Sequence, residues 1–352
     1  MKRRRKQTDT CPAIDLLALA DIVEHFPSRT ILVLGDFVAD VFQFGDITRV
    51  SREAPVLILR HRETRIVPGG GANAANNFAS LGARVIPITA VGEDGAGDLL
   101  VNAFRQQKID TSRIVRAKNW TTPAKTRFLA GWAHTVGQQV LRVDYEPTQP
   151  LGEADRKRLR TSLLASIARA DALAISDYGL GVVNLSDLRS AAARIKKNIP
   201  VTLDSRYRLT DYKRAGITSA TPNEAEMEAL HHTVIGKDLA ELERCGSATL
   251  QDMKLHSLLI TRGKDGMALF QQSRSPTHIP IHGSNQAVDV TGAGDTVLAA
   301  YTLALSSGAT PLEAAHIANI AGGLVVMKRG TATVSLIELL EAIQNAASEA
   351  NL

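Results

Sequence analysis

Apolar residues in this chain fall into two kinds of segment that follow one another in order. Short continuous apolar runs, such as 172–175, 201–203 and 257–260, are typical of strands buried on both faces. Longer segments carry apolar residues at helical spacing, and they span 153–169, 184–197, 312–328 and 335–349. Regular alternation of strand and helix indicates a parallel sheet covered by helices on both faces. The pattern therefore predicts an α/β domain.

The first half of the chain fits the same plan. Residues 31–34 form an apolar run that ends at Gly35, and 84–91 form another. Helices are predicted at 72–81, where Gly82 stops the pattern, and at 98–107.

Two segments, at about 40–66 and 119–145, break this plan. Their apolar and polar residues alternate loosely, which is typical of exposed antiparallel strands. We expect them to form a small β-sheet lid on a single domain covering 30–350. Residues 1–29 are predicted to be a basic N-terminal extension containing a short helix.

The charge of the chain resides in its first residues. Lys2 to Lys6 supply five positive charges, which equals the formal net charge of +5 for all 352 residues, so the remainder is balanced. Such a tail is typical of a solvated terminus, and the alternatives are a weak electrostatic tether or nucleic-acid binding. Aromatic residues make up only 4%, which argues against a base-stacking surface. We expect no nucleic-acid partner.

The composition predicts a cytoplasmic protein. No apolar run reaches 18 residues, so no membrane span is expected, and no apolar run follows the basic tail as a secretory signal requires. Cys11 and Cys245 are too few and too far apart for a disulfide framework.

The most informative motif is a glycine-rich turn at 288–296 that leads into an alanine- and leucine-rich helix. Glycines let backbone N–H groups approach a ligand, and a helix N-terminus favours an anion such as phosphate. The turn contains no lysine, so it is not a P-loop. It contains Asp295 instead, a residue type suited to taking a proton from a hydroxyl that attacks phosphorus. Taken alone, such a motif is more often just a capped helix start.

Polar residues also follow several of the predicted strands: Asp36 and Asp40, Asp177, Asp204, Asn223 and Glu226, and Thr261-Arg262-Gly263. Each alone is an ordinary turn residue. Ligands of open α/β sheets bind at the carboxyl ends of the strands, so together these residues predict a site at that edge.

These motifs together resemble the ribokinase-like carbohydrate kinases, also called the pfkB family. One family signature matches residues 68–82, beginning Pro68-Gly69-Gly70-Gly71-Ala72-Asn73; the other matches 289–295. An Asn-x-x-Glu element lies between them at 223–226. The resemblance covers roughly 30–340 and implies a three-layer α/β/α fold with a mainly parallel sheet and a small β-sheet lid.

The resemblance also implies roles for particular residues. Asp295 would be the general base, and the backbone N–H groups of Gly292, Ala293 and Gly294 would stabilise the transferred γ-phosphoryl group of ATP. Sugar ligands would be Asp36, Asp40, Gly69, Gly70, Asn73 and Asp177. Asn223 and Glu226 would organise Mg²⁺ through water, and Thr261, Gly263, Gly266 and Asn319 would line the adenosine site. Asp289 and Thr291 would help to hold K⁺.

Within the family the chain looks most like the D-glycero-D-manno-heptose 7-phosphate kinases, through elements such as Arg49-Val50-Ser51 and Ser176-Asp177-Tyr178-Gly179. Arg52, Leu180 and Ser205-Arg206 depart from that subgroup, where proline, lysine and Pro-Lys are usual. Cations expected to meet a phosphate on the acceptor are Lys125, Arg127 and Arg142, followed by Arg49 and Arg206. Lid strands in the family often pair between subunits, which implies a homodimer. The alternatives are a kinase for another sugar, sugar phosphate or nucleoside, or a sugar-binding regulator without catalysis.

Overall fold

The computed structural model describes residues 14–131, 138–195, 199–284 and 286–350. Its central sheet has the strand order β14-β13-β12-β11-β10-β9-β1-β4. The strands are β1 Thr30–Gly35, β4 Arg84–Ile88, β9 Ala172–Asp177, β10 Val201–Ser205, β11 Ser219–Ala220, β12 Ser257–Thr261, β13 Met267–Gln271 and β14 Thr277–Ile279. Pairing is parallel from β4 across to β12 and antiparallel for β12-β13 and β13-β14. The predicted mainly parallel sheet is confirmed.

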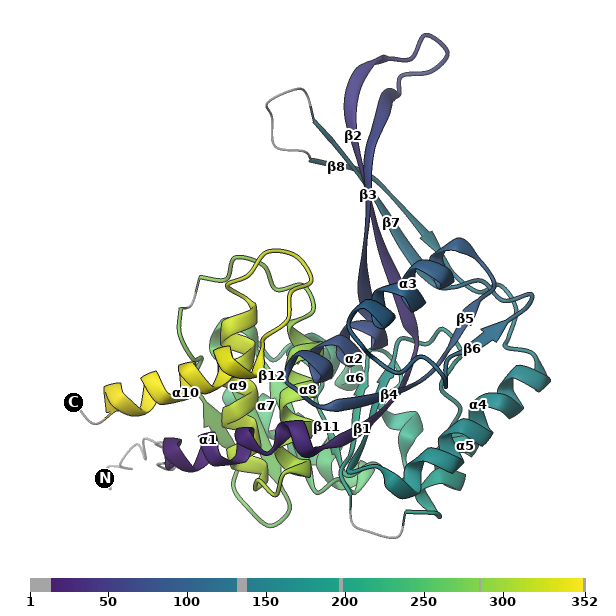
Figure 1. Ribbon diagram of the computed structural model, residues 1–352. Coiled ribbons are helices and arrows are strands. Elements are labelled where there is room, and N and C mark those ends of the chain that lie inside the picture. The colour runs from purple at the N-terminus through teal and green to yellow at the C-terminus, as the bar shows by residue number, and fades with distance from the viewer. Residues whose placement is uncertain (1–13, 132–137, 196–198, 285, 351–352) are drawn as a thin grey trace.

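Both faces of this sheet are buried, as its continuous apolar runs predict. In β1, Ile31 and Val33 enter one hydrophobic cluster, whereas Leu32 and Leu34 enter the other. Helices of the first cluster are α1 Leu16–Glu24, α2 Gly71–Ser80, α3 Gly95–Gln106, α8 Ala293–Ser306, α9 Pro311–Val325 and α10 Leu336–Ala350. Those of the second are α4 Glu153–Ser166, α5 Leu185–Ala192, α6 Glu224–His231 and α7 Leu239–Met253. The result is the three-layer α/β/α arrangement (Figure 1).

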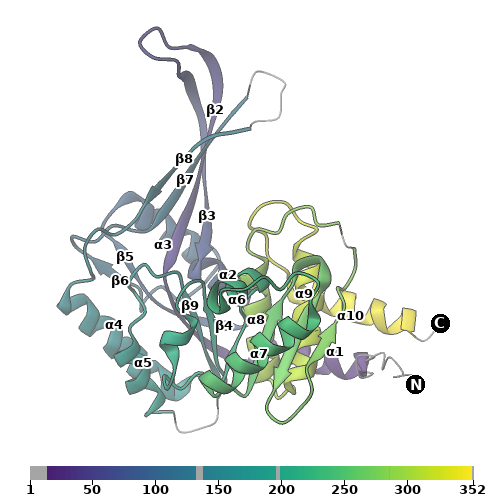
Figure 2. The same ribbon diagram turned by 180° about the vertical axis from the view of Figure 1, so that it is seen from behind.

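The short helix expected near the N-terminus is α1, and it packs as part of the domain. It lies beside α10 (Figure 2). Leu19, Val23 and Phe26 are fully buried in the core. The basic residues 2–6 lie outside the described residues.

The lid is a second sheet of order β3-β2-β7-β8 that projects from the body (Figure 1). Its strands are β2 Phe37–Val50, β3 Leu57–Gly70, β7 Ala124–Gly131 and β8 Gln138–Tyr145. The prediction of purely antiparallel lid strands is wrong at the centre, since β2 and β7 pair in parallel. A long crossover through α2, β4 and α3 separates β3 from β7, and it brings the chain back in the direction of β2.

The predicted strand at 84–91 is divided. Its first part is β4, and its end is β5, Ala90–Gly92, which pairs with β6, Val115–Ala117, in a separate two-stranded sheet. Between them, the buried hydroxyl of Thr89 donates to the carbonyl oxygen of Gly35 at 2.8 Å. This contact ties the break in the strand to the end of β1.

Five of the parallel strands, β1, β9, β10, β11 and β12, end at one edge of the sheet, beside the root of the lid and the start of α8 (Figure 1). Across the described part of the chain, no helix combines the length and apolar character needed to cross a membrane.

Candidate active site

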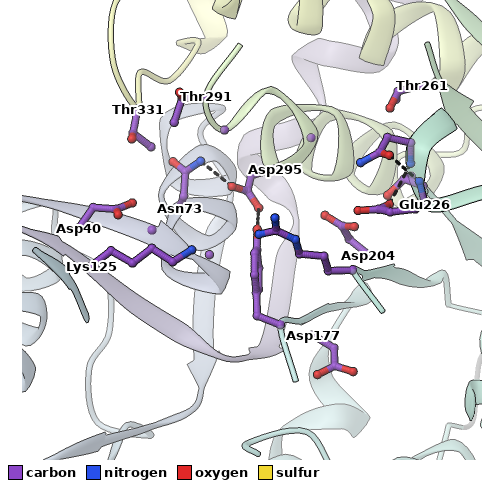
Figure 3. Close-up of a pocket in the computed structure, with 18 of the residues that line it drawn as sticks. Asp40, Asn73, Lys125, Asp177, Asp204, Glu226, Thr261, Thr291, Asp295 and Thr331 are labelled. Atoms are coloured by element: carbon purple, nitrogen blue, oxygen red, sulfur yellow. Dashed lines mark hydrogen bonds between the residues drawn. The ribbon is translucent and has the colours of Figure 1, made fainter. Parts of the chain in front are cut away.

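The polar residues at the strand ends surround a cavity of about 300 Å³ between the lid root and α8 (Figure 3). The lid and α2 contribute Asp40, Gly69, Gly70, Asn73, Lys125 and Arg127. The sheet edge contributes Asp177, Tyr178, Asp204, Arg206, Thr221, Asn223, Glu226 and Thr261. The glycine-rich turn, α8 and the loop after α9 contribute Thr291, Gly292, Gly294, Asp295 and Thr331. The convergence expected from the sequence is therefore present.

Asp295 lies in the first turn of α8 and is 5% exposed. Its Oδ2 accepts a hydrogen bond from Nδ2 of Asn73 at 2.7 Å, and its Oδ1 accepts a longer one from the Tyr178 hydroxyl at 3.4 Å (Figure 3). Burial raises the pKa of Asp295 to about 7, although both hydrogen bonds oppose the shift. A carboxyl with a pKa near neutrality is suited to accept a proton.

The turn before α8 requires glycine for two reasons. Gly292 has φ +78°, and a Cβ built on it would lie 2.5 Å from Nδ2 of Asn73. A side chain there would push away the amide that holds Asp295. The N–H of Ala293 donates to the carbonyl oxygen of Val290 at 3.2 Å, so this predicted phosphate donor is engaged within the turn.

Asp36 is placed differently from its predicted role as a sugar ligand. It is fully buried and does not line the cavity. Its carboxylate accepts the backbone N–H groups of Tyr178, Leu180 and Val182 at 2.9–3.0 Å. Burial raises the pKa of Asp36 to about 6. This carboxylate therefore fastens the loop after β9 to the end of β1.

Asp177 does line the cavity, yet its carboxylate is largely used by protein groups. It accepts hydrogen bonds from the hydroxyl of Tyr212 at 2.6 Å, the N–H of Gly179 at 2.9 Å and the hydroxyl of Ser205 at 3.4 Å. Asp177 therefore supports the neighbouring loops.

The lid side of the cavity combines the ion pair of Asp40 and Arg127 with the ammonium of Lys125. Asp40 pairs with Arg127 at 2.5 Å, and a Cβ on Gly69 would lie 2.3 Å from the Asp40 carboxylate. Gly69 is thus needed for this carboxylate to lie against the backbone. Lys125 stands beside the pair, and burial lowers its pKa. Arg142 does not line the cavity and pairs with Asp144 at 2.5 Å.

Two further carboxylates, Asp204 and Glu226, face the cavity (Figure 3). Burial is the main cause that raises the pKa of each, and for Asp204 the Glu226 charge adds to it. Asn223 and Glu226 also form a reciprocal capping box at the start of α6. Nearby, the Thr221 hydroxyl is buried without a hydrogen-bond partner.

This donor set fits Mg²⁺ held mainly through water. Within the described ranges, no group of three or more His, Cys, Asp or Glu residues converges tightly enough to hold a metal alone. Mg²⁺ in enzymes of phosphate transfer is bound by one or two carboxylates together with water and phosphate oxygens. Asp204, Glu226 and the unsatisfied Thr221 hydroxyl offer that set.

An apolar cavity of about 160 Å³ adjoins the first and shares Thr261 and Gly294 with it. Its lining includes Gly263, Gly266, Asn319, Val290 and Val297. A Cβ on Gly266 would lie 2.1 Å from the carbonyl oxygen of Ile279, so this position requires glycine. The predicted adenosine residues thus gather around one apolar slot, where Asn319 fastens the wall by donating to the Pro280 carbonyl oxygen at 2.8 Å.

Asp289 holds the loops around the glycine-rich turn together. One of its oxygens accepts the N–H of Thr291 and the other accepts that of Gly330, both at 2.9 Å. Hydrogen bonds from Thr291 are the main cause that lowers the pKa of Asp289. Asp289 thus remains an anion beside Thr291, as the expected cation site needs.

Sequence reasoning placed Asp204 at this edge of the sheet without giving it a role, and it did not assign Tyr178 or Thr331 to the site. The strand-end position of Asp204 was a usable signal, because β10 ends beside β9 and β11. Tyr178 had no such signal, since only the folded loop turns its hydroxyl towards Asp295.

The burial of Asp295 has a stability consequence. In the unfolded chain Asp295 is ionised above its ordinary pKa of 3.8. In the folded state it stays largely protonated until about pH 7. The resulting loss in the free energy of unfolding therefore grows between pH 3.8 and 7 and is complete above pH 7. Asp295→Asn should raise Tm by about 2 °C or more at pH 8, and the gain should shrink towards pH 4. Calorimetry across pH measures this, with the exposed Asp265→Asn as the control; an equal Tm for wild type and Asp295→Asn at pH 8 would contradict the burial argument.

Known proteins share both the sequence and the fold of this chain. The model of the pfkB family carbohydrate kinases matches residues 28–338. The bifunctional protein HldE of Mesorhizobium japonicum is 38% identical over 91% of this chain and 63% of its own length, so the chain spans under two thirds of that relative. HldE of Haemophilus influenzae is also 38% identical, over 92% of this chain and 66% of that protein.

Among solved structures, Arabidopsis thaliana ribokinase with ribose and ATP superposes with a TM-score of 0.68 at 20% identity, covering 90% of this chain and 99% of that one. Phosphofructokinase-2 from Escherichia coli, in complex with potassium, gives 0.71 at 21% identity, with 91% and 99% coverage. At such identities these two show the fold alone. Because the family model matches most of the chain, this chain belongs to the pfkB family of carbohydrate kinases.

Proposed function

We propose that this carbohydrate kinase transfers the γ-phosphate of ATP to the anomeric hydroxyl of D-glycero-D-manno-heptose 7-phosphate, giving the 1,7-bisphosphate. The single observation that carries the kinase chemistry is the buried Asp295 carboxylate at the start of α8, between an apolar slot and a polar cavity. The heptose substrate is supported by the subgroup motifs and by the 38% identity to HldE proteins.

The adenine would enter the apolar slot lined by Gly263, Gly266 and Asn319, so that the phosphates reach the glycine-rich turn. The N-terminal N–H groups of α8, at Gly294 and beyond, would stabilise negative charge on the transferred group. Mg²⁺ held near Glu226 and Asp204 would neutralise phosphate charge. Asp295 would accept the proton of the attacking hydroxyl as the new P–O bond forms and the bond from the γ-phosphorus to the bridging oxygen breaks, so that ADP leaves.

Replacing the base tests this assignment. Asp295→Asn should lower the rate of ADP release by about 10²- to 10⁴-fold, because the amide cannot accept the proton. In wild type, kcat/KM should fall as pH drops through about 7, since protonation removes the base. A coupled ADP assay at saturating Mg²⁺ measures both, and Asp265→Asn serves as the exposed control. Full turnover by Asp295→Asn would refute the assignment.

The same assay discriminates the acceptor. The panel is D-glycero-D-manno-heptose 7-phosphate, fructose 6-phosphate, fructose, ribose and adenosine. Preference for the heptose phosphate, with NMR showing a phosphate at the anomeric carbon, supports the proposal. Preference for another acceptor would support the alternative kinases on this fold, and no turnover of any acceptor would support a non-catalytic sugar-binding regulator. Turnover with and without KCl tests the K⁺ site expected beside Asp289 and Thr291.

Cations in the cavity favour an acceptor that already carries a phosphate. Lys125, Arg127 and Arg206 line it, but Arg127 is neutralised by Asp40. Lys125 is the better candidate for binding this phosphate. Its ammonium is half-buried, and it forms no ion pair with any carboxylate in the part of the chain that the structure describes. Arg206 lines the cavity beside Asp204 and Glu226 and would meet phosphate as well.

Lys125→Met should therefore raise KM for the sugar phosphate by about 10- to 100-fold while leaving KM for ATP unchanged, as expected on losing a charged hydrogen bond. Steady-state kinetics measures both constants, and Lys118→Met, an exposed lysine outside the cavity, is the matched control. An equal increase in KM for phosphorylated and unphosphorylated sugars would show that Lys125 does not bind the phosphate of the acceptor.

The lid supports a homodimer. Its edge strands β3 and β8 leave backbone groups available for pairing, and Leu57, Val140 and Leu141 are exposed on them. Sedimentation should give a dimer at micromolar concentration and a monomer for Leu141→Glu, because burying that charge is costly. A monomeric wild-type protein would contradict this. ATP as co-substrate is consistent with a cytoplasmic enzyme.

A further inference from the structure

Tyr178 occupies a position that the kinase chemistry above does not yet use. It lies between two carboxylates that belong to different parts of the fold. Its backbone N–H donates to Oδ2 of Asp36 at 3.0 Å, and its hydroxyl donates to Oδ1 of Asp295 at 3.4 Å. Its ring also lines the cavity, with the ammonium of Lys125 5.9 Å from the ring centre. The residue thus connects the end of β1, the lid and α8.

The backbone around Tyr178 is held independently of Asp295. Asp36 also accepts the N–H groups of Leu180 and Val182 at 2.9 Å, so three hydrogen bonds fix the loop that carries the tyrosine. A Cβ on Gly70 would lie 3.2 Å from Cε2 of Tyr178, so glycine there lets the ring pack against the chain. The position of the phenol beside Asp295 is therefore set by the hydrogen bonds to Asp36 and by the packing of the ring against Gly70.

We propose that Tyr178 is a positioning residue for the general base. This inference rests on the proposed function, in which Asp295 accepts the proton of the acceptor. Asn73 holds Oδ2 of the carboxylate, and the Tyr178 hydroxyl holds Oδ1. With a donor at each oxygen, rotation of the carboxylate about its Cβ–Cγ bond is restricted, while the side chain still lines the cavity.

The phenol can act only as a donor in this arrangement. The negative charge of Asp295, followed by burial, raises the pKa of Tyr178 well above its usual value, so the hydroxyl keeps its proton. A donor to a carboxylate stabilises the charged form and lowers its pKa, and Tyr178 has this effect on Asp295. Tyr178 thereby opposes the burial that raises the pKa of the base.

The test is Tyr178→Phe, which removes the hydroxyl and keeps the ring. We expect kcat with D-glycero-D-manno-heptose 7-phosphate, or with whichever panel sugar turns over best, to fall about 10-fold or more, because a misplaced base is a poor proton acceptor. The acid limb of the kcat/KM profile should move to higher pH. The Kd for ATP, measured by calorimetry, should stay unchanged. A carboxyl infrared band absent from Asp295→Asn should titrate at higher pH in Tyr178→Phe than in wild type.

Tyr301→Phe is the matched control. Tyr301 lies in α8 like Asp295, but it is fully buried in the core, and its hydroxyl hydrogen-bonds to that of Ser257 at 2.8 Å. The control loses a buried hydrogen bond without touching the cavity, so its Tm should fall while its pH profile stays that of wild type. A Tyr178→Phe variant with wild-type kcat and pH profile would overturn the inference. So would one that loses activity only together with Tm and ATP affinity, without a shifted acid limb.

The two proposals fail separately. If Asp295→Asn retains turnover, the proposed function fails whatever Tyr178→Phe does. If Asp295→Asn is inactive and Tyr178→Phe behaves as wild type, only the positioning role fails. The infrared titration needs no acceptor, so an incorrect choice of sugar does not affect it.

Discussion

The organisation of this protein depends on keeping one carboxylate, that of Asp295, buried beside the cavity with a hydrogen-bond donor at each oxygen. Burial alone would favour the neutral acid, and it brings the pKa to about 7. The start of α8 offsets part of this cost, because a helix N-terminus stabilises negative charge. Asn73 from α2 and Tyr178 from the loop after β9 supply donors to its two oxygens. Three separate elements must therefore meet at one side chain.

Several residues at this edge of the sheet serve the fold and the site together. Asn223 and Glu226 form the capping box in the first turn of α6, and both also line the cavity. Gly292 and Gly69 are needed because side chains there would displace Asn73 and Asp40. Local stability and site geometry are therefore hard to alter independently.

Asp36 links the body to the lid. It is the single residue between β1, in the central sheet, and β2, in the lid sheet. Its buried carboxylate fastens the loop that carries Tyr178, and its carbonyl oxygen accepts the N–H of Gly71 at 2.9 Å, at the start of α2. The residue at the junction of the two sheets thus also supports both hydrogen-bond partners of Asp295, which connects the root of the lid to that carboxylate.

The sequence by itself determined the layered fold and the edge at which the site lies. Alternating apolar runs and helical segments specify a covered parallel sheet, and polar residues after the strands must then gather at their carboxyl ends. The sequence did not determine which partners the side chains at this edge contact. Asp36 turned towards backbone N–H groups, Arg142 paired with Asp144 outside the cavity, and Tyr178 turned towards Asp295. The parallel pairing of β2 with β7 likewise followed from a long crossover. These orientations and pairings depend on contacts between residues far apart in the chain. Hydrophobic periodicity does not reveal such contacts, because it indicates only which face of each element is buried.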